Sequence, residues 1–138
     1  MDKETLIEGL NRDLAGEYRA ILQYLQHSYM LKGLERLTLG ELFKKFAIGE
    51  MKHAEFLAEK IVALGGVPTV TPLSIVQPTT AREMLQANLA AERQAIADYK
   101  ERADQAEEYG DEGLEVELEE IMAEETRHAE ELEKLLGG

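Results

Sequence analysis

The chain has 138 residues, no cysteine, and 28 acidic against 15 basic side chains, which gives a formal charge of −13. The acidic balance disfavours nucleic-acid binding, because a phosphate backbone is bound by a basic face, and it favours the attraction of cations. The lack of cysteine excludes disulfides and thiolate-bound metals, and it fits a reducing, cytoplasmic compartment.

The composition predicts an all-α protein with one domain over residues 1–138, because good helix formers dominate and β-branched runs are few. No apolar run is long enough to span a membrane, and the amino terminus is too polar for a signal peptide. Apolar residues recur at helical spacing in four segments, which we expect to form helices at residues 3–32, 36–64, 80–109 and 111–136. Gly33 marks the first turn, and Gly110 marks the third, with Asp111 as the expected N-cap of the last helix.

The connection between the second and third helices is longer, and it ends in a capping box formed by Thr80 and Glu83. Each long helix should measure roughly 40–45 Å, whereas about 15 extended residues reach roughly 50 Å. The connection can therefore run the length of the bundle, which leaves helices two and three parallel in a four-helix bundle with one long crossover. Its apolar residues either cover their own bundle or pack against a partner subunit: Val70, Leu73, Ile75 and Val76.

One spacing occurs twice in the chain. A lone glutamate is followed, about one helix hairpin later, by a Glu-x-x-His motif, first as Glu17 with Glu50 and His53. The same pattern returns in the second half with identical internal spacing, as Glu92 with Glu125 and His128. The separation between corresponding members, such as Glu17 and Glu92, is the same for all three pairs, and we call it the repeat offset. All of these residues fall on the apolar faces of their predicted helices, where an isolated charge is costly unless it is paired or bound to a metal.

These six residues suit two metal ions held between four helices. Residues i and i+3 share one helix face, so each Glu-x-x-His pair can chelate one ion. Carboxylates with one imidazole per ion favour iron, with manganese as an alternative, over magnesium or calcium. We expect Glu17 and Glu92 to be terminal ligands. Glu50 and Glu125 would bridge the two ions and leave coordination positions open for O₂ or peroxide. Otherwise the glutamates reach solvent, and the protein is a metal-free acidic scaffold.

Two segments resemble a known family. Residues 49–55 (Gly-Glu-Met-Lys-His-Ala-Glu) are very close to the second-helix motif of bacterioferritins, and residues 14–17, with Tyr24 two turns on, are similar to their first helix. Over nearly all of residues 1–136 the chain resembles the ferritin-like superfamily, and within it most of all the bacterioferritins. The resemblance implies a ferroxidase that binds two Fe²⁺ ions at the six residues and oxidises them with O₂ or H₂O₂. The Fe³⁺ would pass to a mineral inside a hollow homo-oligomer, for iron storage or detoxification.

The same resemblance implies roles for two further residues. Tyr24 would donate a hydrogen bond or an electron beside the ligands, with a plain core aromatic as the alternative. Met51 would ligate haem b at a two-fold subunit interface, with ordinary apolar packing as the alternative. Larger members carry a short fifth helix that lines the channels of a 24-subunit cage, and since the sequence ends at Gly138 we expect a short form without it. The expected homo-oligomer is a dimer-based shell or cage, with a smaller shell, a dimer or a different assembly as the alternatives.

A second interpretation is a rubrerythrin-like di-iron peroxidase or oxidase that stores no iron. Rubrerythrins typically carry a further glutamate one turn after the third-helix ligand, where this chain has Ala95. The DNA-protecting mini-ferritins, whose metal sites usually lie between subunits, are a third interpretation. Three other residues are interpreted as structural. His27 is expected to be a surface or interface histidine rather than a third metal site, and Tyr99 a core aromatic, with a supporting role beside the ligands as the alternative. Glu124 is interpreted as a non-ligand because it breaks the repeat offset.

Overall fold

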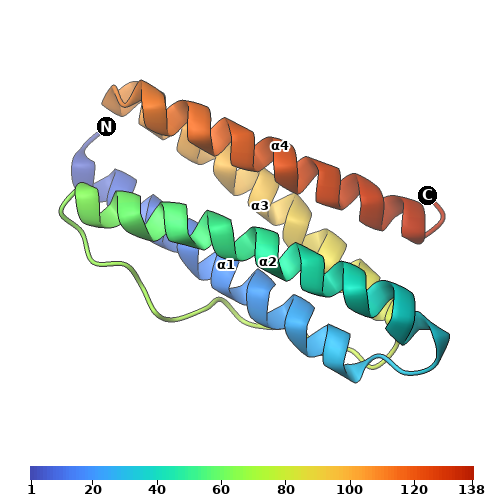
Figure 1. The fold of residues 1–138 in the computed structure, drawn as a ribbon. Coiled ribbons are helices and arrows are strands. Elements are labelled where there is room, and N and C mark those ends of the chain that lie inside the picture. The colour runs from blue at the N-terminus through green and yellow to red at the C-terminus, as the bar shows by residue number, and fades with distance from the viewer.

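The computed structural model describes residues 1–138 and contains four α-helices (Figure 1). They are α1 (Lys3–Met30), α2 (Leu34–Ala63), α3 (Ala81–Tyr109) and α4 (Glu112–Leu135). The predicted all-α four-helix architecture is confirmed, and each helix begins and ends within two residues of its predicted position. None of the four helices combines the length and the apolar character that crossing a membrane requires.

Local signals in the sequence set the helix ends. The side chains of Asp2, Thr80 and Asp111 each accept a hydrogen bond from the backbone N–H three residues later, at 2.7, 3.2 and 3.1 Å. These bonds satisfy N–H groups that have no partner within a first helical turn. Between α3 and α4, Gly110 adopts a left-handed conformation with a φ of 95°, which a side chain would strain. The predicted caps at Thr80 and Asp111 are therefore confirmed.

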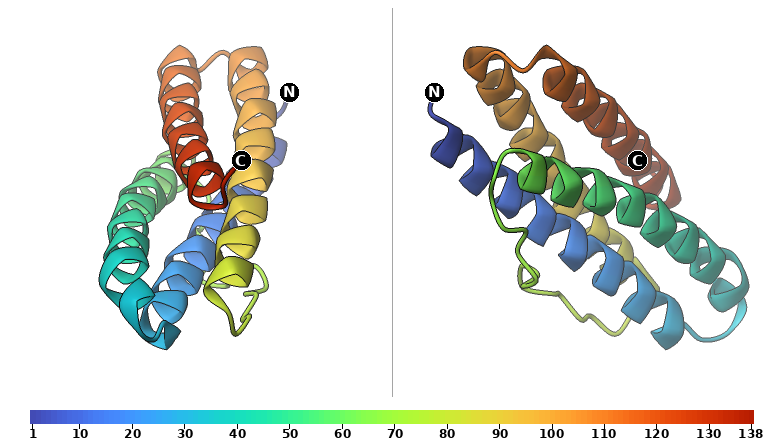
Figure 2. Two further views of the ribbon diagram at one scale, coloured as in Figure 1. Left: turned by 90° about the vertical axis from the view of Figure 1, so that its right-hand side faces the viewer. Right: turned by 60° about the vertical axis from the view of Figure 1, so that its left-hand side comes forward.

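The short turns make α1 antiparallel to α2 and α3 antiparallel to α4, whereas the crossover leaves α2 and α3 parallel (Figure 1). The helix α1 packs against both α2 and α3, and α4 packs against α3. Seen from other sides, the four helices enclose one elongated core, and the crossover lies outside it (Figure 2). This is the single-crossover topology predicted from the length of the second connection.

The crossover, residues 64–80, runs along the outside of α1 and is fastened to it by hydrogen bonds (Figure 1). The Asn11 side chain bonds the crossover backbone twice, at 3.1 and 2.8 Å. Further along α1, Gln23 Oε1 accepts a hydrogen bond from the Val76 N–H at 2.9 Å. The apolar residues of the crossover divide into two half-buried side chains, Leu73 and Ile75, and two exposed ones, Val70 and Val76.

Two apolar clusters fill the core, one towards each end of the bundle. The first includes Leu6, Leu10, Leu57, Ile61, Leu114 and Leu118. The second includes Phe43, Phe46, Met84, Leu85, Leu89 and Leu132. Burying a side chain of this size contributes about 1.5–3 kcal/mol to folding. Polar side chains occupy the middle of the bundle, so an apolar cluster lies on each side of them along the bundle.

Candidate metal centre

Each helix contributes one buried glutamate to the middle of the bundle. Glu17 of α1, Glu50 of α2, Glu92 of α3 and Glu125 of α4 are at most 2% exposed. His53 and His128, one turn after Glu50 and Glu125, are 5% and 8% exposed. The structure thus brings together all six residues that the repeated spacing singled out.

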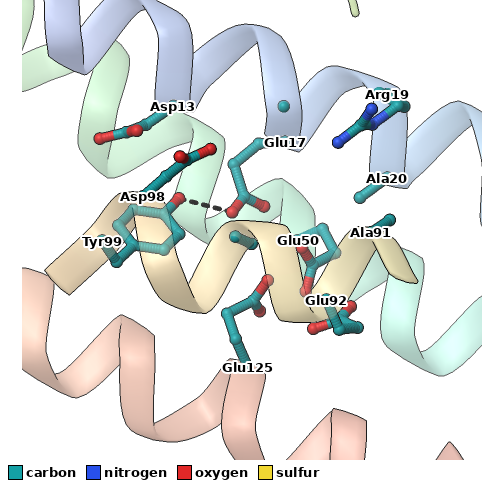
Figure 3. A pocket seen from close by; sticks show the side chains of 12 residues that line it. Asp13, Glu17, Arg19, Ala20, Glu50, Ala91, Glu92, Asp98, Tyr99 and Glu125 are labelled. Atoms are coloured by element: carbon teal, nitrogen blue, oxygen red, sulfur yellow. Dashed lines mark hydrogen bonds between the residues drawn. The ribbon is translucent and has the colours of Figure 1, made fainter. Parts of the chain in front are cut away.

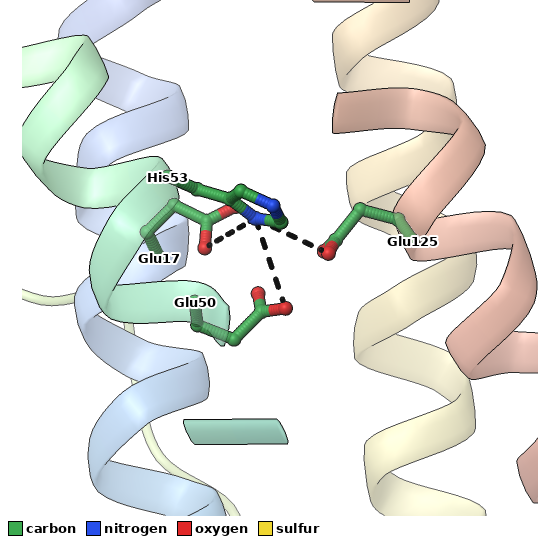
Figure 4. Close-up of side chains that lie close together, drawn as sticks. All are labelled: Glu17, Glu50, His53 and Glu125. Atoms are coloured by element: carbon green, nitrogen blue, oxygen red, sulfur yellow. Dashed lines mark ion pairs between the residues drawn. The ribbon is translucent and has the colours of Figure 1, made fainter. Parts of the chain in front are cut away.

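Their donor atoms form two overlapping groups, in each of which one atom per residue lies within 4.8 Å of the others. One group comprises Glu17, Glu50, His53 and Glu125, and the other comprises Glu50, Glu92, Glu125 and His128. In the first group the His53 ring faces three carboxylates, with Nδ1 at 3.4–3.8 Å from their nearest oxygens (Figure 4). Two ligand atoms bound to one ion at about 2.1 Å lie roughly 3–3.5 Å apart. Glu50 and Glu125 belong to both groups, as carboxylates shared between two ions would.

The donor atoms of this cluster are left without hydrogen-bond partners. Nine buried side-chain nitrogen or oxygen atoms in the chain lack a partner, and seven of them belong to these six residues. They include both oxygens of Glu50 and the Nδ1 atoms of both histidines. A buried polar group without a partner costs about 1–3 kcal/mol, and more when it is charged. Two bound cations, one in each donor group, would give these atoms partners, so the donor set fits a metal centre.

The electrostatics of the cluster also favour a cation. Burial raises the pKa of Glu50 well above its usual range, and the charges of Glu17 and Glu125 raise it further. Burial is likewise the main cause that raises the pKa of Glu125, followed by the charge of Glu92. For His53, burial lowers the imidazole pKa, but the neighbouring carboxylates, Glu17 first, outweigh it and raise the pKa. Four crowded carboxylates resist ionising together, and two divalent cations would offset their charge.

Two tyrosines each give a hydrogen bond to one oxygen of Glu17 or Glu92, whose other oxygens stay unpaired. Tyr24 of α1 donates its hydroxyl hydrogen to Glu92 Oε1 at 2.9 Å, and Tyr99 of α3 donates to Glu17 Oε1 at 2.5 Å. Burial and the adjacent carboxylates raise the pKa of both phenols, so both remain donors. Tyr99 belongs to the apolar core, as its favoured interpretation had it, and its hydroxyl also has the supporting role beside a ligand that was the alternative. Tyr99 lies at the repeat offset from Tyr24, and this was a signal that could have identified it.

The far side of each imidazole has a different environment. His53 Nε2 lies 2.9 Å from Glu124 Oε2, whereas His128 Nε2 lies 4.0 Å from Glu124 Oε1. A carboxylate can only accept a hydrogen bond, so His53 Nε2 donates to Glu124, and Nδ1 is the nitrogen that would bind a metal ion in the cluster. The ring of His128 instead stacks on Phe46, with centroids 4.1 Å apart and planes inclined by 20°. Glu124 contacts the centre without belonging to either donor group, and no spacing in the sequence signalled it.

A small cavity of about 20 Å³ reaches the carboxylates between α1 and α3 (Figure 3). Small residues from both helices form part of its wall: Gly16, Ala20, Ala91 and Ala95. A cavity of this size holds one water-sized particle. The short side chains therefore keep a space beside the carboxylates for a small molecule or ion.

Two other residues lie away from the cluster. His27 is fully buried: its Nε2 lies 2.8 Å from the Val76 carbonyl oxygen, and its Nδ1 accepts a hydrogen bond from Asn88 at 3.0 Å. The prediction of a surface or interface histidine is therefore wrong, because the crossover folds over this side chain. Met51 is 48% exposed on α2 and lies beside an open groove lined also by Tyr18 and Ile21.

Comparisons with known proteins agree with this geometry. The ferritin-like domain family matches residues 7–138. A crystal structure of a ferritin-like, diiron-carboxylate protein from Bacillus anthracis shares 43% identity, with a TM-score of 0.96 over 99% of both chains. A Rhodobacter capsulatus bacterioferritin, solved with a metal-free dinuclear site and haem iron in a crystallographic special position, shares 28% identity, with a TM-score of 0.92 over 99% of this chain and 86% of that one.

Among characterised sequences, a bacterioferritin from Mycobacterium leprae is 34% identical over 128 residues, which cover 92% of this chain and 80% of the relative. A nutrient stress-induced DNA-binding protein from Synechococcus sp. is also 34% identical over 128 residues, covering 85% of this chain and 72% of the relative. The chain therefore belongs to the family of ferritin-like domains, and within that family its sequence and fold resemble those of bacterioferritins.

Proposed function

We propose that the protein is a ferroxidase of the bacterioferritin kind, which takes part in iron storage or detoxification. It would bind two Fe²⁺ ions as substrate at Glu17, Glu50, His53, Glu92, Glu125 and His128. Each Fe²⁺ gives up one electron, so a pair supplies the two electrons that reduce O₂ to H₂O₂, or H₂O₂ to water, with two protons taken up. The observation that carries the proposal is the convergence of seven unpaired buried donor atoms on one place in the bundle.

The side chains divide the work of holding the ions. Glu50 and Glu125, shared by both donor groups, would bridge them, while Glu17 and Glu92 would each bind one ion from opposite sides. The raised pKa values of Glu50 and Glu125 favour the protonated carboxyls when no cation is near. Binding of Fe²⁺ would displace those protons, because a metal ligand must be deprotonated. Mixed carboxylate and imidazole donors suit iron, with manganese as the alternative.

An aerobic Fe²⁺ titration of the apo-protein tests the proposal, with Fe³⁺ formation and the iron retained per chain as readouts. We expect oxidation faster than in buffer alone, continuing well past two irons per chain with a soluble mineral retained. Saturation at two irons per chain would instead indicate a rubrerythrin-like di-iron oxidase or peroxidase that stores no iron. An oxidation rate equal to that of the buffer would reject both activities.

Variants connect the activity to the centre. E50A and H128A should each abolish rapid Fe²⁺ oxidation, since each removes a buried donor, and both should keep the helical circular dichroism of the parent. The control is E120A, which makes the same Glu-to-Ala change at an exposed position one turn before Glu124. Unchanged oxidation kinetics in E50A or H128A would contradict the assignment of the site.

We also propose that Met51 ligates haem b between two copies of the chain. The side chain is half exposed beside an open groove between α1 and α2. Two further apolar residues of these helices, Leu22 of α1 and Ile48 of α2, are exposed as well. A haem titration followed in the Soret region should show a methionine-ligated spectrum that M51L loses. Sedimentation should show a homo-oligomer, and an M51L spectrum identical to that of the parent would remove Met51 as the ligand.

We place the protein in the cytoplasm and propose that it does not bind DNA. The similar Synechococcus protein is described as DNA-binding, but a charge of −13 on this chain repels a phosphate backbone. DNA mobility in a gel should be unchanged by the protein at physiological salt.

A further inference from the structure

The sequence repeat gives the two halves of the centre the same donor residues, and two of the positions at which the halves differ bear on the imidazoles. Every donor residue and both tyrosines have a counterpart of the same type at the repeat offset. Glu124, by contrast, has Gly49 as its counterpart, and Phe46 has Ile121. Both differences lie next to the imidazoles, so the chain gives its two histidines different support.

Glu124 serves one histidine closely and the other at a distance. Its Oε2 accepts a hydrogen bond from His53 Nε2 at 2.9 Å, while its Oε1 remains 4.0 Å from His128 Nε2. Gly49 leaves the space that this carboxylate occupies, because a Cβ there would lie 3.2 Å from Glu124 Oε1 and 3.9 Å from His128 Cε1. Gly49 therefore offers His128 no carboxylate of its own.

The two environments differ in what they do to a ligand nitrogen. A carboxylate that accepts the Nε2–H of His53 fixes the ring orientation, keeps the lone pair on Nδ1 and makes that nitrogen more basic. The Phe46 ring stacked on His128 restricts the orientation of that imidazole, but a hydrocarbon ring does not take up the Nε2 hydrogen. A metal ion should therefore be held more strongly beside His53.

We propose that Glu124 is a positioning residue that makes the two metal positions unequal, so that the position formed with Glu17 and His53 binds a divalent cation more tightly than the position formed with Glu92 and His128. This inference rests on the metal centre of the proposed function but not on its oxidation chemistry. Redox-inactive Zn²⁺ can therefore test it.

The first experiment is a calorimetric Zn²⁺ titration of the apo-protein in its native assembly. We expect two binding steps of unequal affinity. E124A should weaken the tighter step by roughly 10–100-fold, the usual effect of losing a hydrogen-bond partner of a metal ligand, and should change the weaker step little. E124Q should retain part of the affinity, because its amide oxygen still accepts the Nε2–H although the charge is lost. E120A is the charge-matched control and should leave both steps unchanged.

The second experiment moves the carboxylate from α4 to α2. In the double variant G49E/E124A, the shortened residue 124 leaves room for the new side chain, which would approach His128 instead of His53. Anomalous scattering from crystals loaded with one Zn²⁺ per chain should place the ion beside His53 in the parent and beside His128 in the double variant. Equal occupancy of the two positions in the parent, or the same preference in both proteins, would overturn the inference.

The failures of the two proposals are distinguishable. If the apo-protein binds no Zn²⁺ and oxidises no Fe²⁺, the metal centre itself is wrong. Suppose instead that Fe²⁺ oxidation is rapid, that the parent binds Zn²⁺ in two steps of equal affinity, and that E124A binds Zn²⁺ as E120A does. Only the inequality of the two positions would then be wrong. Unchanged unfolding midpoints of apo E124A and apo E124Q would show that the loss of affinity does not come from a damaged fold.

Discussion

Tyr24 and Tyr99 connect Glu92 and Glu17 across the α1–α3 interface. Each phenol stands on one of these helices and donates its hydrogen to the glutamate on the other, so the two bonds run in opposite directions. A hydrogen bond to a charged acceptor contributes about 1.5–3 kcal/mol. The tyrosines thus hold Glu17 and Glu92 in place before any metal ion arrives.

Removing one hydroxyl should leave a buried carboxylate oxygen without a partner. We expect Y99F to lower the free energy of unfolding of the apo-protein by about 1–3 kcal/mol and to slow Fe²⁺ oxidation, since Glu17 loses its orientation. Denaturant unfolding and oxidation kinetics measure the two effects. Y29F is the matched control, because Tyr29 is 62% exposed and its hydroxyl has no role in the centre. If Y99F and Y29F gave equal values, the Tyr99 bond would have no energetic importance.

At this scale the sequence contained a strong signal for some residues and none for others. The six donor residues could be identified because charged or polar side chains are unusual on an apolar helix face, and these recur at a fixed offset. Tyr99 obeys the same offset, but an aromatic on an apolar face is ordinary, so packing in the core was the favoured prediction and contact with a ligand only the alternative. Glu124 breaks the offset and lies among many glutamates. Its contact with His53 depends on the distance between α2 and α4, which no local pattern encodes.

Buried polar pairs connect α1 with α3 on both sides of the centre. Arg102 donates to the two carboxylate oxygens of Asp13 at 2.9 and 3.2 Å, and towards the other end of the bundle Asn88 donates to His27. The two pairs occupy corresponding positions in the repeat, because Asn88 lies at the repeat offset from Asp13, and Arg102 lies at the same offset from His27. The repeat therefore extends from the donor residues to the packing of the helices that carry them.

Gly9 of α1 provides the space for the Arg102 guanidinium, since a Cβ there would overlap that group. The guanidinium could move away only by breaking its two bonds to the buried Asp13. We expect G9A to destabilise the protein by about 1–3 kcal/mol through overcrowding, although alanine is the better helix former by about 1 kcal/mol. In the control G40A the added Cβ would meet nothing nearer than 3.8 Å, so stability should be kept or raised. Urea unfolding compares the two, and a G9A midpoint at or above that of G40A would contradict the prediction.

Helices and topology were predictable because their signals are local or depend on length. Caps such as Thr80 and Asp111 act within one turn, and the crossover is long enough to span the bundle whatever its detailed path. That path was not predictable, because it depends on isolated polar side chains of α1, such as Asn11 and Gln23, that bond the crossover backbone. The burial of His27 was not predictable for the same reason, because it requires the crossover to lie over this side chain.

Electrostatic repulsion between acidic side chains opposes the folding of the metal-free protein. A formal charge of −13 produces self-repulsion, and the most crowded carboxylates lie in the core rather than on the surface. Burial raises the pKa of Asp13 to about 7 despite the opposing effect of Arg102, and it raises the pKa values of Glu50 and Glu125 as well. Metal binding and pH should therefore act on the stability of the molecule together.

The sign of this pH dependence follows from the shifts. A carboxyl whose pKa is raised on folding contributes stability that is fully present below its unfolded pKa, 3.8 for Asp13 and 4.5 for Glu50, and that is lost as the pH rises through the folded value. Asp111, whose hydrogen bond from Lys60 lowers its pKa, acts in the opposite sense only below its ordinary value of 3.8. Between pH 5 and pH 8 the raised carboxyls and His53, whose imidazole pKa is also raised, favour the folded state at the lower pH. His27 alone opposes them in this range, because burial lowers its imidazole pKa, so we expect the raised groups to set the sign of the slope.

We accordingly expect the metal-free protein, kept in chelator, to have a higher Tm at pH 5 than at pH 8. Saturating Zn²⁺ should raise the Tm more at pH 8, where fewer protons compete for the donor atoms. E125Q should flatten the apo slope and reduce the Zn²⁺ effect, because it removes one raised carboxyl that is also a proposed ligand. The control E120A should keep both the slope and the Zn²⁺ effect. Scanning calorimetry at the two pH values measures all of these, and an apo Tm that rises from pH 5 to pH 8 would show that the buried carboxyls are not protonated in the folded chain.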